Sequence, residues 1–362
     1  MHEPKAILRS VATASPGEPV SQEALKKILC DLWIGSDRAL QTMLNVFDTA
    51  GVRSRHFALP LEEYVGLENF TQRNEKFIET ARVLNVRAAR KALARADLLP
   101  EDVTHVMVVT STGIATPSLD ARLINDLPLP GSVRRCPVWG LGCGAGGASL
   151  GLAADFARSS PDAVVLVVVV ELCSLAFVPG TKTKLNLVAS ALFGDGAAAV
   201  VVTGSGSGLE LTSHRTTTWP DTLDMMGWNV GDEGLGLVLS RNLPAFARER
   251  MPDVMEDLYA SVGWASDETP AFAALHPGGP KVLEALAEGT GLPDHLLAPA
   301  RRVLSRYGNM SAPTFLYVLE DILAETPEPS GPGIYSVMGP GFTCDCGVLT
   351  PVPVPAGVSI RS

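Results

Sequence analysis

The stretch "GLGCGAGGASLGLAADFA", residues 140–157, sets one cysteine among glycines and alanines directly before a helical pattern. The preceding residues, "SVRRCPVWG", read as a strand, so we predict a sharp strand-to-helix turn at Cys143. Free amide groups at the start of a helix favour a thiolate there, and they also offer hydrogen bonds to an oxyanion. The sequence equally allows a buried, unreactive cysteine in a tight turn.

The composition excludes several classes of protein. The chain has 362 residues, a net charge of -10 and 46% hydrophobic residues, which argues against nucleic-acid binding and indicates a large core. The first ten residues contain no apolar signal core, and the aliphatic run at 163–170 is too short for a membrane helix, which needs about 20 residues. The six cysteines form no zinc pattern. We therefore expect reduced thiols, a cytoplasmic location and no bound metal.

Strands and helices alternate along the chain, which predicts the α/β class. The alternation restarts after "GSGSG" at residues 204–208. We therefore predict two similar halves, residues 1–203 and 208–362, that arose by internal duplication. The first half carries the cysteine described above, and the second carries the two stretches described next.

His276 ends the apolar strand "AFAAL" and is followed by "PGGP" and a helical pattern. A histidine at such a strand end can take or give a proton near neutral pH, although a satisfied core histidine is the alternative. Asn309, in "SRYGNMSAPTF", precedes a helix that Ser311 is placed to cap, and it is otherwise a simple turn residue.

Together these three residues indicate one chemistry. In open α/β sheets, such strand and loop ends gather at one crevice. A cysteine beside a histidine is an activated nucleophile, and a neutral amide stabilises an enolate or oxyanion without adding negative charge. The trio Cys143, His276 and Asn309 therefore suits acyl transfer to the cysteine and carbon–carbon bond formation through a thioester enolate.

Five motifs in order carry a family resemblance: "GCGAGG", "LFGDGAAAVVV", "HPGGP", "YGNMSAPTFLYVL" and "MGPGFT". The chain resembles type III polyketide synthases, the chalcone-synthase-like branch of the thiolase superfamily, and in particular bacterial alkylpyrone and alkylresorcinol synthases. The resemblance implies a thiolase-like fold of two duplicated αβαβα-type halves with mixed five-stranded sheets, assembled as a homodimer. It also implies an acyl-CoA starter on Cys143, extension by decarboxylative condensation with malonyl-CoA, cyclisation, and no metal or redox cofactor.

The resemblance further places substrate-binding residues. Phe193 falls at a gate between tunnel and pocket, and Leu237 stands where the family keeps a second gating phenylalanine. Thr116 falls on a loop that reaches toward the partner subunit. The other expected substrate-binding positions are Ala176, Trp228, Ser311, Gly339, Pro340 and Gly341.

Binding of coenzyme A has a weaker sequence signal. The basic residues that plant members use are not matched, so Arg53 and Arg55 in "GVRSRH" are substitutes by neighbourhood, with solvated surface arginines as the alternative. The loop after His276 adds Gly278, Gly279 and Lys281, the last within reach of a pantetheine arm.

Three other functions compete with this interpretation. A β-ketoacyl synthase of the KAS III kind shares the three residue types and makes a single condensation on acyl carrier protein, but "HPGGP" and "GNMSA" favour the polyketide branch. A papain-like protease also uses Cys, His and Asn in this order, but the spacing to Asn309 fits poorly and the C-G-[SA]-C-[WY] context is absent. An inactive thiolase-fold scaffold would not need all three residues.

Overall fold

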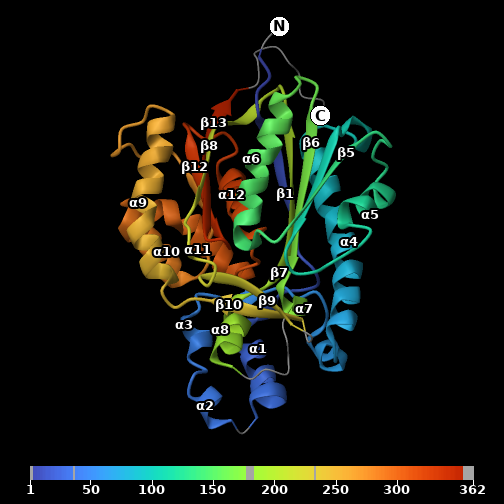
Figure 1. The fold of residues 1–362 in the computed structure, drawn as a ribbon, viewed down its shortest axis with the longest axis vertical. Coiled ribbons are helices and arrows are strands. Elements are labelled where there is room, and N and C mark those ends of the chain that lie inside the picture. The colour runs from blue at the N-terminus through green and yellow to red at the C-terminus, as the bar shows by residue number, and fades with distance from the viewer. Residues whose placement is uncertain (1–2, 36, 177–182, 232–233, 354–362) are drawn as a thin grey trace.

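The computed structural model describes residues 3–35, 37–176, 183–231 and 234–353, and its core is one hydrogen-bonded sheet of nine strands (Figure 1). The strand order is β11-β12-β13-β8-β1-β7-β6-β4-β5. From one edge to the other, these are β11 (Ala273–Leu275), β12 (Gly333–Gly339), β13 (Thr343–Val352), β8 (Gly208–Thr218), β1 (Ile7–Ala14), β7 (Asp195–Thr203), β6 (Val164–Leu172), β4 (His105–Thr110) and β5 (Arg134–Trp139).

The order of strands is repeated in the two parts of the chain. In the first part β4 and β6 are parallel, while β6–β7 and β7–β1 are antiparallel; in the second, β11 and β12 are parallel, while β12–β13 and β13–β8 are antiparallel. From this repeat we infer an internal duplication. The boundary at residues 204–208 remains a prediction, and residues 1–2 and 354–362 of the two predicted halves lie outside the described part of the chain.

The α/β thiolase-like fold is confirmed, but two details differ from the expected pair of five-stranded sheets. A short pairing of β1 with β8, at Leu8 and Leu209, joins the two groups of strands into one sheet. Among the described residues the second group has four strands, because α11 (Asp294–Tyr307) occupies the chain position that β5 holds in the first group.

The helices form layers around the strands. Figure 1 shows α6 (Ala145–Arg158) and α12 (Thr314–Glu325) in the centre, α4 (Phe70–Arg95) and α5 (Leu119–Asp126) beside the first group, and α9 (Leu243–Ser261) and α10 (Pro280–Thr290) beside the second. The remaining helices are α1 (Gln22–Leu29), α2 (Arg38–Gln41), α3 (Val46–Thr49), α7 (Cys173–Ala176) and α8 (Lys184–Leu192).

Alternating side chains on the buried strands explain this layering. On β6, Val165, Val167 and Val169 pack in the same core cluster as α6, whereas Leu166 and Val168 pack in the cluster that includes α4. All of them are buried, so a run of apolar residues fills both faces of this central strand.

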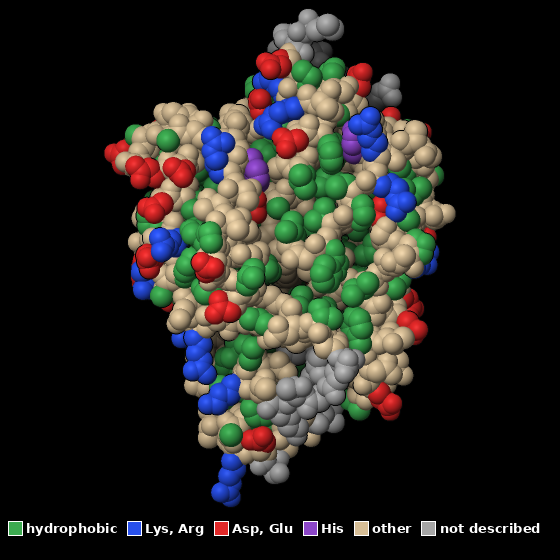
Figure 2. Space-filling model, viewed as in Figure 1, with side chains coloured by type: hydrophobic (Ala, Val, Ile, Leu, Met, Phe, Trp, Pro, Cys, Tyr) green, Lys and Arg blue, Asp and Glu red, His purple; other side chains and the backbone are tan. Residues whose placement is uncertain are grey.

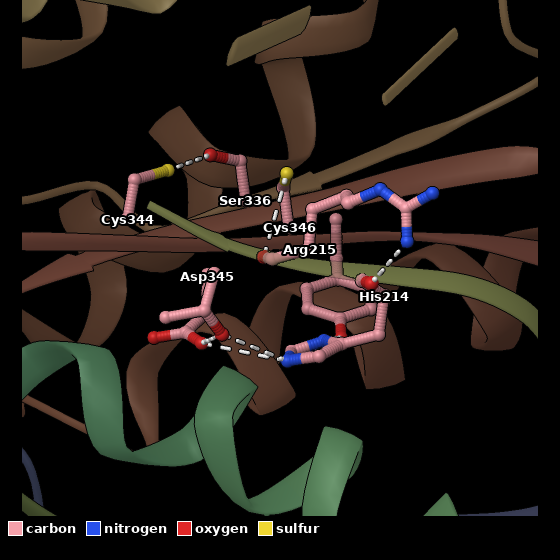
Figure 3. Close-up of polar contacts among 8 residues, drawn as sticks. His214, Arg215, Ser336, Cys344, Asp345 and Cys346 are labelled. Carbon is pink, nitrogen blue, oxygen red and sulfur yellow. Dashed lines mark hydrogen bonds and ion pairs between the residues drawn. The ribbon is translucent and has the colours of Figure 1, made fainter. Parts of the chain in front are cut away.

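The side chains of β13 also alternate between the two faces of the sheet (Figure 3). Asp345 accepts a hydrogen bond from the Thr216 hydroxyl at 2.6 Å, and His214 lies 2.6 Å from the Tyr335 hydroxyl on the same side. Cys344 and Cys346 are fully buried on the other face, where the Cys344 Sγ lies 3.8 Å from the Met251 sulfur. These two thiols are therefore part of the core packing.

Two short pairs of strands lie outside the nine-stranded sheet. β2 (Val20–Ser21) pairs with β3 (Ser54–Arg55), and β9 (Met226–Gly231) pairs with β10 (Gly234–Leu239) in a hairpin. Figure 1 shows this hairpin crossing the lower end of the central layer, above α8. Within the described ranges, no helix is both long enough and apolar enough to cross a membrane.

We predict that Gly146→Ala destabilises the protein. A Cβ at this position on α6 would lie 2.5 Å from the Phe315 ring and 2.6 Å from the Ala312 carbonyl oxygen, so the two central helices would have to separate. Overpacking of this kind costs about 1–3 kcal/mol, whereas Gly→Ala in an open helix stabilises by about 1 kcal/mol. Urea denaturation measures the change. Ala148→Ser, on a half-buried position of α6, is the control, and an unchanged or raised stability for Gly146→Ala would contradict the prediction.

Candidate active site

The turn that carries Cys143 explains the glycines around it. The chain leaves β5, passes through a single 3-10 turn at Gly142–Gly144 and enters α6 at Ala145. Gly142 has a φ of 48°, and a Cβ there would lie 2.7 Å from the Pro340 ring. A Cβ on Gly144 would lie 3.1 Å from the Gly339 Cα. The small residues therefore allow this turn to pack directly against the backbone at the end of β12.

Cys143 is half-buried, and its Sγ lies 3.3 Å from the Ser311 hydroxyl oxygen. It lines a cavity of about 680 Å³, including the open mouth. His276 and Asn309 line the same cavity, so the structure brings together the three residues that the sequence singled out.

His276 and Asn309 are both buried but are held in different ways. The two ring nitrogens of His276 have no hydrogen-bond partner among the described residues, while its backbone N–H donates to Ser336. The Asn309 side chain is fixed: its Oδ1 accepts from the Ser311 N–H at 2.7 Å, and its Nδ2 donates to the Gly278 carbonyl at 3.2 Å. The imidazole is thus free to exchange a proton, and the amide keeps one N–H available.

Burial sets the protonation of this pair. It raises the pKa of the Cys143 thiol to about 11 and lowers the pKa of the His276 imidazole to about 4. The hydrogen bond with Ser311 acts in the opposite direction on the thiol but does not outweigh burial. At pH 7 the thiol is protonated and the imidazole neutral, which differs from the resting thiolate expected from the helix start.

Five predicted substrate-binding residues line the cavity: Phe193, Trp228, Leu237, Ser311 and Pro340. Gly278, which was predicted to bind coenzyme A, lines it as well. Phe193 is also tied to Asn309 through backbone hydrogen bonds, from Gly194 N–H to Asn309 and from Asn309 N–H to Leu192. Ser311 contacts Cys143 directly and does not accept a hydrogen bond as a helix cap; Pro313 is the residue that precedes α12.

Other predicted residues lie outside the described lining: Ala176, Thr116, Gly339, Gly341, Gly279, Lys281, Arg53 and Arg55. Ala176 is fully buried in α7, and Gly339 is packed against the Cys143 turn. Thr116 lies exposed on the loop before α5, and Lys281 lies exposed on the first turn of α10.

The prediction that Arg55 contacts coenzyme A is wrong for this structure. The residue is 0% exposed, so its guanidinium cannot reach a phosphate in solvent. It donates instead to the backbone carbonyls of Ser190, Ala191 and Phe193. Arg53, two residues earlier, is exposed and donates through Nε to the Ser305 hydroxyl.

Eight of the eighteen residues that line the cavity were not predicted from the sequence: Cys173, Met226, Gly227, Val238, Leu239, Leu243, Val282 and Met338. Cys173 directly follows the buried strand β6, and its position at a strand end was an available signal. The apolar residues of β9 and β10 gave no such signal, because only the folded hairpin brings them to the cavity mouth.

Glu171 is a further buried group behind Cys143, at the end of β6. One carboxylate oxygen accepts from the Thr112 hydroxyl at 2.6 Å, the Ser111 N–H at 3.0 Å and the Thr110 hydroxyl at 3.2 Å; the other has no hydrogen-bond partner among the described residues. The Ser111 hydroxyl in turn accepts from the Gly142 N–H at 2.9 Å. Glu171 therefore supports the Cys143 turn from behind.

Two family models match this chain: the N-terminal domain of chalcone and stilbene synthases over residues 1–207, and the C-terminal domain over residues 210–353. The chain belongs to the chalcone and stilbene synthase family. Among its relatives, a 1,3,6,8-tetrahydroxynaphthalene synthase of Streptomyces peucetius subsp. caesius is 38% identical over 345 residues, 93% of this chain and 90% of the relative. A putative chalcone synthase of Bacillus subtilis (strain 168) is 32% identical over 355 residues, 94% and 97% of the two chains.

The fold gives the same assignment. The crystal structure of 1,3,6,8-tetrahydroxynaphthalene synthase from Streptomyces coelicolor A3(2), a bacterial type III polyketide synthase, superimposes with a TM-score of 0.91 at 30% identity. The match covers 96% of this chain and all of the other. The chain is thus a type III polyketide synthase, an acyltransferase that works by decarboxylative condensation, and the single-condensation and protease alternatives are set aside.

We predict that Glu171→Gln removes a pH-dependent loss of stability. Burial raises the pKa of Glu171 from 4.5 to about 7, so the folded state holds a proton that the unfolded state has released. The folded state is therefore penalised as pH rises from about 4.5 to 7, by up to about 3 kcal/mol. Urea denaturation of both proteins across this range isolates the effect, since all other titrating groups are shared. Parallel stability curves for the two proteins would contradict the prediction.

Proposed function

We propose that Cys143, His276 and Asn309 carry out the condensation in one cavity. His276 takes the Cys143 proton as the sulfur attacks the starter thioester. The carbonyl–sulfur bond of the acyl-CoA breaks, and the imidazolium returns the proton to the departing coenzyme A thiolate. The observation that carries this proposal is the shared cavity, in which the imidazole nitrogens have no partner among the described residues.

The extension step uses the second pair of groups. The bond between malonyl-CoA and its carboxylate breaks, carbon dioxide leaves, and the electron pair forms a thioester enolate. The N–H of neutral His276 and the second N–H of Asn309 Nδ2 donate to the enolate oxygen. The enolate carbon then attacks the acyl-Cys143 carbonyl, which forms the carbon–carbon bond and releases the Cys143 thiolate for the next loading. Carbon dioxide loss drives the step without any change of redox state, so we propose no metal or redox cofactor.

The residues of the cavity wall support one class of starter. Its described side chains are mostly apolar: Phe193, Met226, Trp228, Leu237, Val238, Leu239, Leu243, Val282 and Met338. Apolar walls bind alkyl chains by removing them from water, at about 0.8 kcal/mol per methylene. This supports a fatty acyl-CoA starter and release of an alkylpyrone or alkylresorcinol.

A tetrahydroxynaphthalene is the second candidate product. The Streptomyces peucetius relative, 38% identical, is named for it. That molecule carries no alkyl substituent, so its synthesis needs no fatty starter. The two candidates therefore differ in whether the starter's chain appears in the product.

The phosphates of coenzyme A need positive charge at the mouth of the cavity, since the net charge of the chain is -10. Exposed Arg53 and Lys281 remain our proposed contacts, with Gly278 and Gly279 beside the pantetheine arm. Gly278 lines the cavity, which supports entry of the pantetheine arm along this loop. All six cysteines are free thiols, consistent with work in the cytoplasm, where coenzyme A thioesters are made.

Exposed apolar side chains on the face of the molecule that α6 crosses support a homodimer. Figure 2 shows hydrophobic side chains gathered in the middle of this face, with charged side chains mostly nearer its rim. Three large apolar side chains are exposed: Trp139 on the edge strand β5 by 49%, Ile114 in the loop after β4 by 45%, and Leu152 on α6 by 40%. β5 has an unpaired edge in the described chain, and the exposed loop with Thr116 follows Ile114.

Product analysis tests the proposed function. We expect the enzyme, given decanoyl-CoA and malonyl-CoA, to form products that contain the decanoyl chain. The mass of each product should correspond to that chain plus one malonyl unit, less carbon dioxide, for every extension. Cys143→Ala is expected to form none, because no acyl thioester can be held. Liquid chromatography with mass spectrometry identifies the products. Formation of tetrahydroxynaphthalene from malonyl-CoA alone, with no incorporation of decanoyl, would replace the alkyl product with the second candidate.

We predict that Leu237→Phe shortens the starters that are accepted. The larger ring narrows the apolar passage beside Trp228, its partner across the hairpin. Exclusion of two methylenes lowers kcat/KM for the longest starters about 10-fold or more. A series of acyl-CoA chain lengths measures the profile. Val230→Phe adds the same ring on an exposed position of the hairpin, so it should leave the profile unchanged. An unaltered profile for Leu237→Phe would exclude it as a gate.

A further inference from the structure

Arg55 is a buried cation with an unusual set of acceptors. Its Nη1 donates to the carbonyls of Ser190 and Phe193 at 2.8 and 2.9 Å, and its Nη2 donates to the Ala191 carbonyl at 2.9 Å and to the Gln22 side-chain oxygen. These carbonyls belong to the last turn of α8 and the residue after it. The last carbonyls of a helix lack partners within the helix, and a cation there is favourable.

The segment held by Arg55 is also the segment that holds Asn309. The Asn309 N–H donates to the Leu192 carbonyl at 2.9 Å, and the Gly194 N–H donates to the Asn309 carbonyl at 3.0 Å. Thus Asn309 is hydrogen-bonded on both sides of Phe193, whose own carbonyl accepts from Arg55. These two backbone hydrogen bonds, which we call the backbone bridge, join the segment around Phe193, the predicted gate, to Asn309, whose amide we propose to bind the enolate.

Arg55 also touches the other side of this bridge. A Cβ on Gly194 would lie 3.2 Å from the Arg55 Cβ, and a Cβ on Gly308 would lie 3.7 Å from it. In addition, the Arg53 N–H donates to the Ser305 carbonyl, which fixes strand β3 to the end of α11 just before Asn309. Arg55 therefore lies where the three chain segments around residues 55, 193 and 308 pack together.

We propose that Arg55 is a positioning residue for the condensation: it fixes the backbone bridge between Phe193 and Asn309 and thereby aims the Asn309 amide at the enolate. The inference rests on the proposed roles of Asn309 and Cys143. Replacing Arg55 should therefore slow decarboxylation more than loading. In the proposed mechanism, Asn309 serves malonyl-CoA decarboxylation and extension, whereas loading of the starter needs Cys143 and His276.

A guanidinium suits this place for a geometric reason. Its planar fork presents several N–H donors in fixed directions, so one side chain reaches three carbonyls and an amide oxygen together. Burial lowers the pKa of Arg55 to about 9, while nearby Asp195 acts to raise it, so the cation is retained at pH 7. A lysine ammonium at the same place keeps the charge but cannot match all four acceptors.

The test separates loading from decarboxylation in Arg55→Met and Arg55→Lys. Loading is the rate at which Cys143 gains one acyl group in a single turnover, read by intact-protein mass spectrometry. Decarboxylation is the release of carbon dioxide from malonyl-CoA. Both rates are divided by the fraction of protein with an alkylatable Cys143, which corrects for misfolded material. We expect decarboxylation in Arg55→Met to fall about 10-fold or more, as small misplacements of catalytic groups do, while loading falls less than about 3-fold. Arg55→Lys should recover part of the loss.

Control variants distinguish a positioning role of Arg55 from a general structural role and from phosphate binding. Arg95→Met removes another arginine that donates to a backbone carbonyl, that of Val11, and should leave the ratio of the two rates unchanged. Equal losses of loading and decarboxylation in Arg55→Met would overturn the proposal in favour of a general structural role. A raised KM for both coenzyme A thioesters with unchanged decarboxylation kcat would overturn it in favour of phosphate binding. If Arg55→Met does not fold, Arg55→Lys is judged by the same ratio, and Gln22→Met, which removes one acceptor of the guanidinium, is the milder second variant.

Asn309→Ala distinguishes failure of this inference from failure of the proposed function. If Asn309→Ala loses decarboxylation but Arg55→Met and Arg55→Lys keep it, Arg55 has no positioning role and the proposed function stands. If Asn309→Ala itself keeps full decarboxylation, the role proposed for Asn309 is wrong and the inference about Arg55 falls with it.

Discussion

The cavity depends on a close approach of two backbone segments, the Cys143 turn and the end of β12. A Cβ on Gly339 would lie 2.6 Å from the Leu141 carbonyl oxygen and 2.7 Å from the Gly144 nitrogen, so no larger residue fits at this contact. The contact fixes the sulfur in the middle of the molecule, although it follows an edge strand of the sheet.

The repeated strand order explains why an amide meets the thiol there. Cys143 precedes α6, which leads into β6, and Asn309 precedes α12, which leads into β12; β6 and β12 hold the same place in their groups of strands. The two central helices pack side by side, with the Phe315 ring on α12 against Gly146 on α6. Duplication thus brings the same kind of position, in the turn that leads into a central helix, to the cavity twice, once with a thiol and once with an amide.

The sequence predicted the local elements, because these follow from near neighbours in the chain. It also singled out Cys143, His276 and Asn309, which the structure brings to one cavity. The glycines around Cys143 and the apolar run of β6 are local signals, and the structure agrees with both. What could not be predicted depends on tertiary contacts. Arg55 sits among polar residues in the sequence, which suggested a surface position, but the folded chain places it against unpaired carbonyls at the end of α8. The helical segment in place of a fifth strand was missed for the same reason, as were four hairpin residues at the cavity: Met226, Gly227, Val238 and Leu239.

The protonation states of Cys143 and His276 show most clearly that tertiary burial can outweigh a local sequence signal. The helix start favours a thiolate at Cys143, yet burial opposes any charge in the cavity and leaves thiol and imidazole neutral at pH 7. In the mechanism we propose, malonyl-CoA enters after Cys143 has been acylated. The acyl thioester carries no charge, and neutral His276 and Asn309 keep their N–H groups for the enolate. The negative charge of the enolate then develops where these two donors can reach it.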